Sequence, residues 1–121
     1  MAKTISADFP TVKIGATTYT LNPTLAAVRR VNVALGGLLP AFRRCNDLDI
    51  DAIAAVIAAG AGLEFEDQDE ADKFAERVWK ADRDAYIKGL VAFLSLLLAG
   101  GRKPDEKKPD EAAEDKPEGN A

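Results

Sequence analysis

The stretch Leu90 to Ala99 is the feature that most restricts how this chain can fold, because it is apolar on almost every side of the helix it would form. It supplies about half of the ~20 residues that a helix needs to cross a bilayer, so we expect no membrane span here. A helix that is apolar all round usually lies at the centre of a core. A chain of 121 residues has few other elements to cover it. We therefore expect surplus apolar surface, covered by a partner protein or by a second copy of the chain.

Four side chains of this last helix are the expected anchors for a partner, namely Leu90, Phe93, Leu94 and Leu97. They recur at helical spacing and would share one face, which could lie in the groove of another protein. The corresponding test is Phe93→Asp, which should leave the chain soluble if the face binds only a partner. Unfolding of this variant would instead make the face part of the core.

Residues 12–37 predict a β-hairpin followed by a helix with marked ends. β-branched and aromatic residues flank Gly15-Ala16, where a tight turn would lie. Asn22 can serve as the N-cap, Pro23 as the first helical residue, and Gly36-Gly37 as the stop. Because a two-stranded hairpin is only marginally stable alone, we expect it to pack against helices or another subunit. The apolar stripe predicted for the helix consists of Leu25, Val28, Val31 or Asn32, and Leu35.

Further helices are predicted along the rest of the chain. A short one opens at Leu38 and ends near Asn46, and a third, capped by Asp49, runs to Gly60 or Gly62. The fourth is the most clearly amphipathic, and its predicted inner side consists of Ala71, Phe74, Ala75, Val78 and Trp79. The last helix is predicted to start at Asp82 or Asp84 and to run to about Ala99. We therefore expect a mainly α fold, a small domain of about four to five helices with an N-terminal β-hairpin.

Composition divides the chain into three parts: a flexible N-terminus (1–10), the helical domain with its hairpin (11–99) and a charged tail (100–121). The tail contains no Leu, Ile, Val or aromatic residue, and it repeats the sequence KPDE at 103–106 and 108–111. Such a segment cannot bury a core, so we expect the tail to be disordered and to act as a solubilising extension.

Charge and residue content exclude several classes of function. The net charge of −4 lacks the basic footprint of a nucleic-acid-binding protein. The absence of histidine removes the usual nucleophilic triads and the common zinc ligand sets. The single cysteine, Cys45, is expected to be a small semi-buried residue of a helix. Because the first residues lack an apolar signal segment, we expect a cytoplasmic protein.

Two clusters of acidic residues could suggest metal sites, but their positions favour helix caps and first-turn charges. Asp47, Asp49 and Asp51 have the spacing that opens an EF-hand loop, but Ala52 and Ala58 occupy its essential glycine and glutamate positions. The acidic run 64–72 favours a helix N-terminus, with Asp67 at the cap position. We predict no catalytic, cofactor-binding or metal-binding residue, and therefore no enzyme. Trp79 and Tyr86 are expected to pack in the core.

One part of the chain resembles a known family. Gly15, Tyr19 and Leu21 are close to a G-x-x-Y-x-L hairpin pattern, and Ala26-Ala27 and Gly36 follow in the helix and its stop. In this order of elements the chain resembles the gene-transfer-agent tail protein family, which is similar to the tail assembly chaperones of long-tailed phages. The similarity extends through the alanine-rich helices to about Gly101.

The resemblance implies a non-enzymatic assembly factor. Such proteins are thought to keep the apolar tape-measure protein soluble and to recruit tail-tube subunits around it, so both proteins are expected partners. The factor would act in the bacterial host cytoplasm and be absent from the mature particle. Two alternatives stay open: a structural minor tail or tail-tube component of the virion, and a cellular helical adaptor. Self-association is also expected from the apolar last helix.

Overall fold

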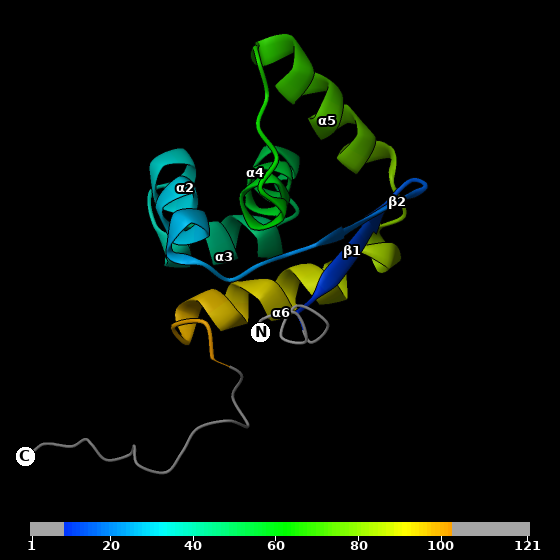
Figure 1. Ribbon diagram of the computed structural model, residues 1–121. Coiled ribbons are helices and arrows are strands. Elements are labelled where there is room, and N and C mark those ends of the chain that lie inside the picture. Colours follow the sequence, from blue (N-terminus) through cyan, green and yellow to red (C-terminus); the bar gives the residue numbers. More distant parts are fainter. Residues whose placement is uncertain (1–8, 103–121) are drawn as a thin grey trace, which may run out of the picture.

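Five α-helices and one two-stranded antiparallel sheet make up residues 9–102, the part of the chain that the computed structural model describes (Figure 1). This confirms the prediction of a mainly α domain with an N-terminal hairpin. The elements are β1 (Thr11–Ile14), β2 (Thr17–Thr20), α2 (Leu25–Leu35), α3 (Leu38–Asn46), α4 (Ile50–Ala61), α5 (Gln68–Lys80), the 3₁₀ turn η1 (Arg83–Ala85) and α6 (Ile87–Leu98). The predictions of a flexible N-terminus (1–10) and a disordered tail (100–121) fall mostly on residues 1–8 and 103–121, which lie outside the described residues.

The hairpin packs on helices, as predicted. Gly15 takes a positive φ of 65°, which glycine adopts without steric cost, and the strands pair from Thr11 with Thr20 to Ile14 with Thr17. Val12 and Ile14 on β1 are fully buried, whereas β2 is largely exposed. The buried side of β1 contacts α6, so the hairpin covers part of the last helix.

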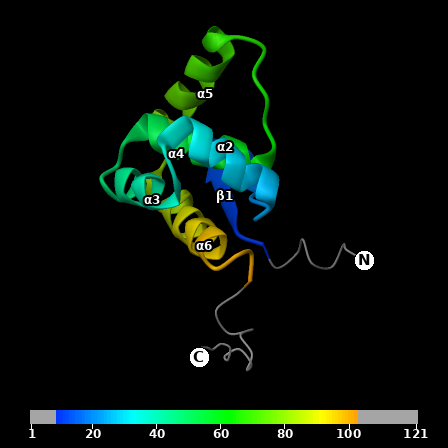
Figure 2. The ribbon, with the colours of Figure 1, turned by 90° about the vertical axis from the view of Figure 1, so that its left-hand side faces the viewer.

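The helix α4, and not the leucine-rich α6, lies at the centre of the domain. It contacts α2, α3, α5, α6 and β2, and most of its residues are buried. Figure 2 shows α2 crossing in front of α4, with α5 above and α6 below. Many of the buried residues of α4 are alanines, whose small side chains let neighbouring helices approach on several sides. The last helix is covered on one side by β1, and α3 and α4 also pack against it.

The first helix starts later than predicted. Its N-cap is Thr24, whose side-chain hydroxyl accepts a hydrogen bond from the Ala27 N–H, and the helix begins at Leu25. Asn22 is not the cap and lies outside the helix, where its backbone N–H donates to the Gly60 carbonyl of α4. The Asn22 carbonyl accepts from the Thr24 N–H, so the chain makes a tight turn at Pro23 just before the helix. The buried stripe is consequently Ala27, Val31 and Leu35, and Leu25 is exposed, contrary to the prediction.

Two further predictions for the C-terminal half need correction. Trp79 is 66% exposed, so it does not pack in the core, whereas Tyr86 is buried as predicted. Asp82 caps only the short turn η1, and α6 begins at Ile87. The start of α5 is as expected, because the Asp67 side chain accepts from the Glu70 N–H.

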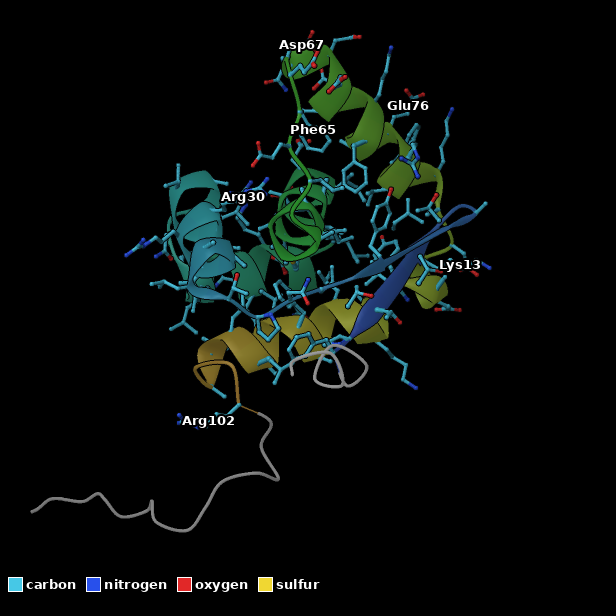
Figure 3. All side chains as sticks on the ribbon, viewed as in Figure 1. Lys13, Arg30, Phe65, Asp67, Glu76 and Arg102 are labelled. Carbon is cyan, nitrogen blue, oxygen red and sulfur yellow. The ribbon has the colours of Figure 1, made fainter. Side chains whose placement is uncertain are left out.

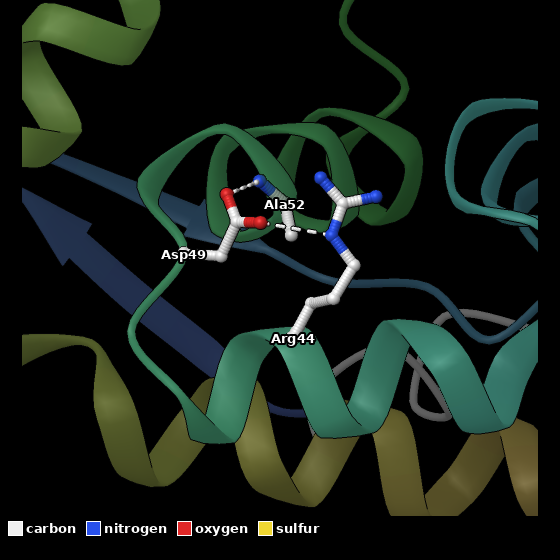
Figure 4. A network of polar contacts seen from close by, with 3 residues as sticks. All are labelled: Arg44, Asp49 and Ala52. Atoms are coloured by element: carbon white, nitrogen blue, oxygen red, sulfur yellow. Dashed lines mark hydrogen bonds and ion pairs between the residues drawn. The ribbon is translucent and has the colours of Figure 1, made fainter.

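The corner between α3 and α4 is held by a small polar network (Figure 4). The Arg44 Nε donates to Asp49 Oδ2 at 2.8 Å, and the Ala52 N–H donates to Asp49 Oδ1 at 3.2 Å. The predicted cap of α4 is thereby confirmed. The Arg44 hydrogen bond and then the Ala52 N–H hold the pKa of Asp49 below its usual value. The carboxylate therefore stabilises the folded state while it is ionised.

We predict that Asp49→Ala lowers the free energy of unfolding by about 1 kcal/mol at neutral pH, the usual effect of losing an N-cap. A carboxylate whose pKa is depressed in the folded state stabilises above its unfolded pKa and loses this effect as the pH falls through the folded value. The difference between variant and wild type should therefore narrow in acid. Urea denaturation at neutral and acid pH measures it, with the exposed neighbour variant Asp47→Ala as the control. An unchanged difference in acid would contradict the role of the ionised carboxylate.

Candidate protein-binding face

The four residues expected to anchor a partner are all buried inside the domain. The exposed fractions of Leu90, Phe93, Leu94 and Leu97 are between 0% and 4%. Because β1, α3 and α4 pack around α6, these side chains belong to the core of the single chain. They are therefore not a binding surface in this conformation, and the prediction that named them as anchors is corrected.

The last helix nevertheless keeps apolar surface at other positions. Val91 is 42% exposed and Leu98 is 45% exposed, and both lie on the side of α6 that borders α3. The neighbouring part of α3 exposes Leu39 at 61%, and Leu48 follows it at 43%. We call this surface the α3–α6 face and define it by Leu39, Phe42, Leu48, Ile87, Val91 and Leu98.

A pocket of about 120 Å³ lies within the α3–α6 face, between the C-terminal end of α3 and the first two turns of α6. Phe42, Leu48, Ile87 and Val91 are among its lining residues, so the exposed residues from the two helices do lie together. Leu90 and Leu94 line it as well, and since both are buried they form its inner wall. Two of the four expected anchors, Leu90 and Leu94, therefore form the buried base of this pocket.

Gly89 marks the side of α6 that faces the core, and it was visible in the sequence. A Cβ atom on Gly89 would lie 2.0 Å from the Thr11 carbonyl oxygen, so α6 touches the backbone of β1 at this residue. Phe93 and Leu97 follow Gly89 at intervals of four residues and share its side of the helix. A glycine inside a helix of large side chains indicates such a close approach. It could have identified Phe93 and Leu97 as core residues.

Leu48 holds an unfavourable backbone conformation within this face. Its φ is 62°, the left-handed region, and it is the one such non-glycine residue between positions 9 and 102. The Leu48 N–H donates to the Cys45 carbonyl and the Asp49 N–H to the Arg44 carbonyl, which is the Schellman pattern that normally ends with glycine. The Arg44–Asp49 network keeps this turn in place. A large apolar side chain therefore stands exposed where glycine would fit with less strain.

We predict that Leu48→Gly changes the free energy of unfolding by less than about 1 kcal/mol. Relief of the left-handed strain, about 1–2 kcal/mol, is offset by the entropy of an added glycine and by the loss of a half-exposed apolar contact. Leu90→Ala is the comparison, because a fully buried leucine should cost about 2–5 kcal/mol. Urea denaturation measures both. A loss at Leu48→Gly as large as that at Leu90→Ala would assign Leu48 to the core.

The chemistry within the pocket is mainly that of apolar contact. Burial, together with the nearby Asp49 carboxylate, raises the pKa of the Cys45 thiol to about 12, so the thiol stays protonated at neutral pH. Cys45 is a helix residue as predicted, but it is buried and not semi-buried. Arg83 is the charged residue that lines the pocket. Such a surface is suited to holding an apolar side chain of another protein.

Within the described residues, no group of three or more acidic or cysteine side chains is arranged to hold a metal ion. No single helix of residues 9–102 is long and apolar enough to cross a membrane. The helices α2 and α3 would be so only if taken together, and they are bent by 69° relative to each other. No protein-family model matches this chain, and no curated protein and no solved structure is significantly similar to it.

Proposed function

We propose that this protein is a tail assembly chaperone of a long-tailed phage or a gene-transfer agent. In this role it binds the tape-measure protein through the α3–α6 face, recruits tail-tube subunits, and catalyses no reaction. It acts in the host cytoplasm and does not remain in the particle.

The residues that carry the family resemblance have defined structural roles, which supports the proposal. Gly15 makes the hairpin turn and Gly36 ends α2 in the left-handed conformation. Leu21 is fully buried, and the ring of Tyr19 packs edge-on against Phe74 at 5.9 Å between centroids. The pattern therefore specifies how the hairpin joins the helices.

The observation that carries the function is the exposed apolar α3–α6 face. Leu39, Leu48 and Val91 remain 42–61% exposed in the single chain, and a pocket opens between the two helices. An apolar patch of this kind, lying along a seam between helices, fits the apolar side of a partner helix. A tape-measure protein with long apolar helical stretches is a client of this chemistry.

The test is to coexpress the chain with a tape-measure protein of a long-tailed phage and to measure how much tape-measure protein stays soluble. Val91→Asp places a charge in the centre of the face and should abolish this effect while the chain itself stays folded. The matched control is Val33→Asp, since Val33 is 89% exposed on α2 and lies outside the face. Equal solubilisation by both variants would contradict binding at the α3–α6 face.

Failure of the wild type to bind the tape-measure protein at all would contradict the proposed function itself. Mass spectrometry of purified particles provides a second check. A chaperone should be absent from them, whereas a minor tail or tail-tube component would be present in stoichiometric amounts.

A further inference from the structure

A second groove lies on the opposite part of the domain, between α2, α4 and α5. Its volume is about 510 Å³, and none of its lining residues belongs to the pocket of the α3–α6 face. α2 and α5 both pack against α4, so α4 forms the floor and the other two helices form the sides. Figure 1 shows α2 and α5 standing apart on either side of α4.

The floor consists of small side chains. Ala54, Ala55 and Ala58 of α4 line it, and Ala71 and Ala75 of α5 continue it up one side. Methyl groups on the floor allow another helix to approach α4 closely, as in tightly packed helix pairs. An extended strand would find no sheet edge there to pair its backbone groups, so a helix is the occupant that the groove favours.

Two aromatic rings give the groove a firm apolar end. Phe65 and Phe74 both line it, and their ring centroids lie 5.6 Å apart. Phe74 is held in turn by the edge of Tyr19, and the Arg77 guanidinium lies 5.7 Å from its ring. Figure 3 shows Phe65 on the segment above α4, with Arg30 reaching across from α2. The rings are therefore positioned before any partner binds.

The charges at the rim indicate the chemistry of the partner. The Arg30 guanidinium donates to the Ala58 carbonyl at 3.3 Å, so it lies against the floor of the groove and keeps its positive charge. Asp51 and Asp72 are exposed at the rim, and neither has an ion-pair partner among residues 9–102. The Asp72 carboxylate accepts one hydrogen bond from Gln68. The groove is thus lined by two aspartates and one arginine, which give it a net charge of −1.

We propose that this groove binds an amphipathic helix of a partner protein, with leucine and alanine on the inner side and lysine or arginine along the flanks. It is a second docking surface, separate from the α3–α6 face and independent of which client that face binds. A chain with both surfaces can hold two helical segments at once. The lysine or arginine flanks pair with Asp51 and Asp72, and the apolar side covers the alanine floor.

The single tryptophan of the chain reports on this groove. Trp79 lies one helical turn beyond Ala75 on the same side of α5, and it is 66% exposed. A helix docked along α5 should cover it and shift its fluorescence emission to shorter wavelength. The probe is a synthetic helical peptide of about 18 residues, five turns, with leucine and alanine on one side and lysines on both flanks. A matched peptide carries glutamates in place of the lysines.

We expect the lysine peptide to shift the Trp79 emission in a saturable manner and the glutamate peptide to bind roughly tenfold more weakly at low ionic strength, a preference that salt reduces. The double variant Asp51→Lys and Asp72→Lys should reverse this preference. Both positions are exposed, so the variant should fold. The control is Asp47→Lys with Asp84→Lys, which changes the net charge equally at exposed positions outside the groove and should keep the wild-type preference.

Three results would overturn the proposal. The first is no saturable shift with the lysine peptide, and the second is an unchanged preference in the Asp51 and Asp72 variant. The third is a shift of Trp79 emission on concentrating the protein alone together with dimers in sedimentation, which would assign the groove to a second copy of the chain. None of these results bears on Val91→Asp and the tape-measure protein, so the two proposals fail separately.

Discussion

Phe93→Asp is expected to abolish the folded state of this domain. The Phe93 side chain is fully buried, and its ring lies so close to α4 that a Cβ atom on Gly60 would come within 2.8 Å of it. Loss of a buried phenylalanine costs about 3–5 kcal/mol, and a carboxylate in its place would also need desolvation or protonation. Domains are stable by only about 5–15 kcal/mol in total, so the variant should be largely unfolded.

Circular dichroism and urea denaturation measure this effect. The matched control is Val91→Asp, which introduces the same charge on the same helix at a residue that is 42% exposed. This variant should keep the wild-type helical signal, and its free energy of unfolding should fall by at most about 1 kcal/mol, as is usual for surface substitutions. A folded and soluble Phe93→Asp variant would indicate that Phe93 lies at the surface. It would support the prediction that Leu90, Phe93, Leu94 and Leu97 bind a partner.

Gly89→Ala is expected to destabilise the domain by about 1–3 kcal/mol, the usual cost of overpacking a core. The added methyl group would lie 2.0 Å from the Thr11 carbonyl oxygen, which is backbone and cannot turn aside. Either α6 or β1 must move, and Val12 and Ile14 would lose part of their burial. At an ordinary helix position the same change would stabilise the protein by about 1 kcal/mol. The sign of the change in the free energy of unfolding therefore shows whether α6 contacts the β1 backbone at this residue.

Thermal or urea denaturation of Gly89→Ala tests this prediction. Ala92→Gly supplies the comparison, because Ala92 is exposed on the same helix and should cost about 1 kcal/mol through helix propensity alone. A Gly89→Ala variant more stable than the wild type would contradict the close contact between α6 and the hairpin.

Local chemistry made several elements predictable from the sequence. Asp49 and Asp67 cap their helices because an aspartate side chain can accept from N–H groups three residues ahead, whatever the rest of the fold does. Gly15 and Gly36 mark the hairpin turn and the end of α2 because both need a positive φ. The mainly α fold and its hairpin follow from such signals.

Predictions that depended on distant residues were less successful. The predicted cap Asn22 lies before the helix, where its N–H pairs with the Gly60 carbonyl, almost forty residues away along the chain, and Thr24 caps α2 in its place. Trp79 continues an apolar stripe of α5, yet no residue between positions 9 and 102 covers that end of the stripe, and its side chain stays exposed. The candidate anchors were assigned to the surface because α6 is apolar all round, so its periodicity did not distinguish an inner side from an outer one.

The sequence by itself determined where the helices and the hairpin lie and that the last helix carries surplus apolar residues. Only the tertiary structure decided that α4 occupies the centre and that β1 covers the Gly89 side of α6. It therefore also decided that Val91 and Leu98 are left exposed in place of Phe93 and Leu97. The physical reason is that a cap or a turn involves residues within a few positions of one another. Burial depends on which distant element packs against a side chain.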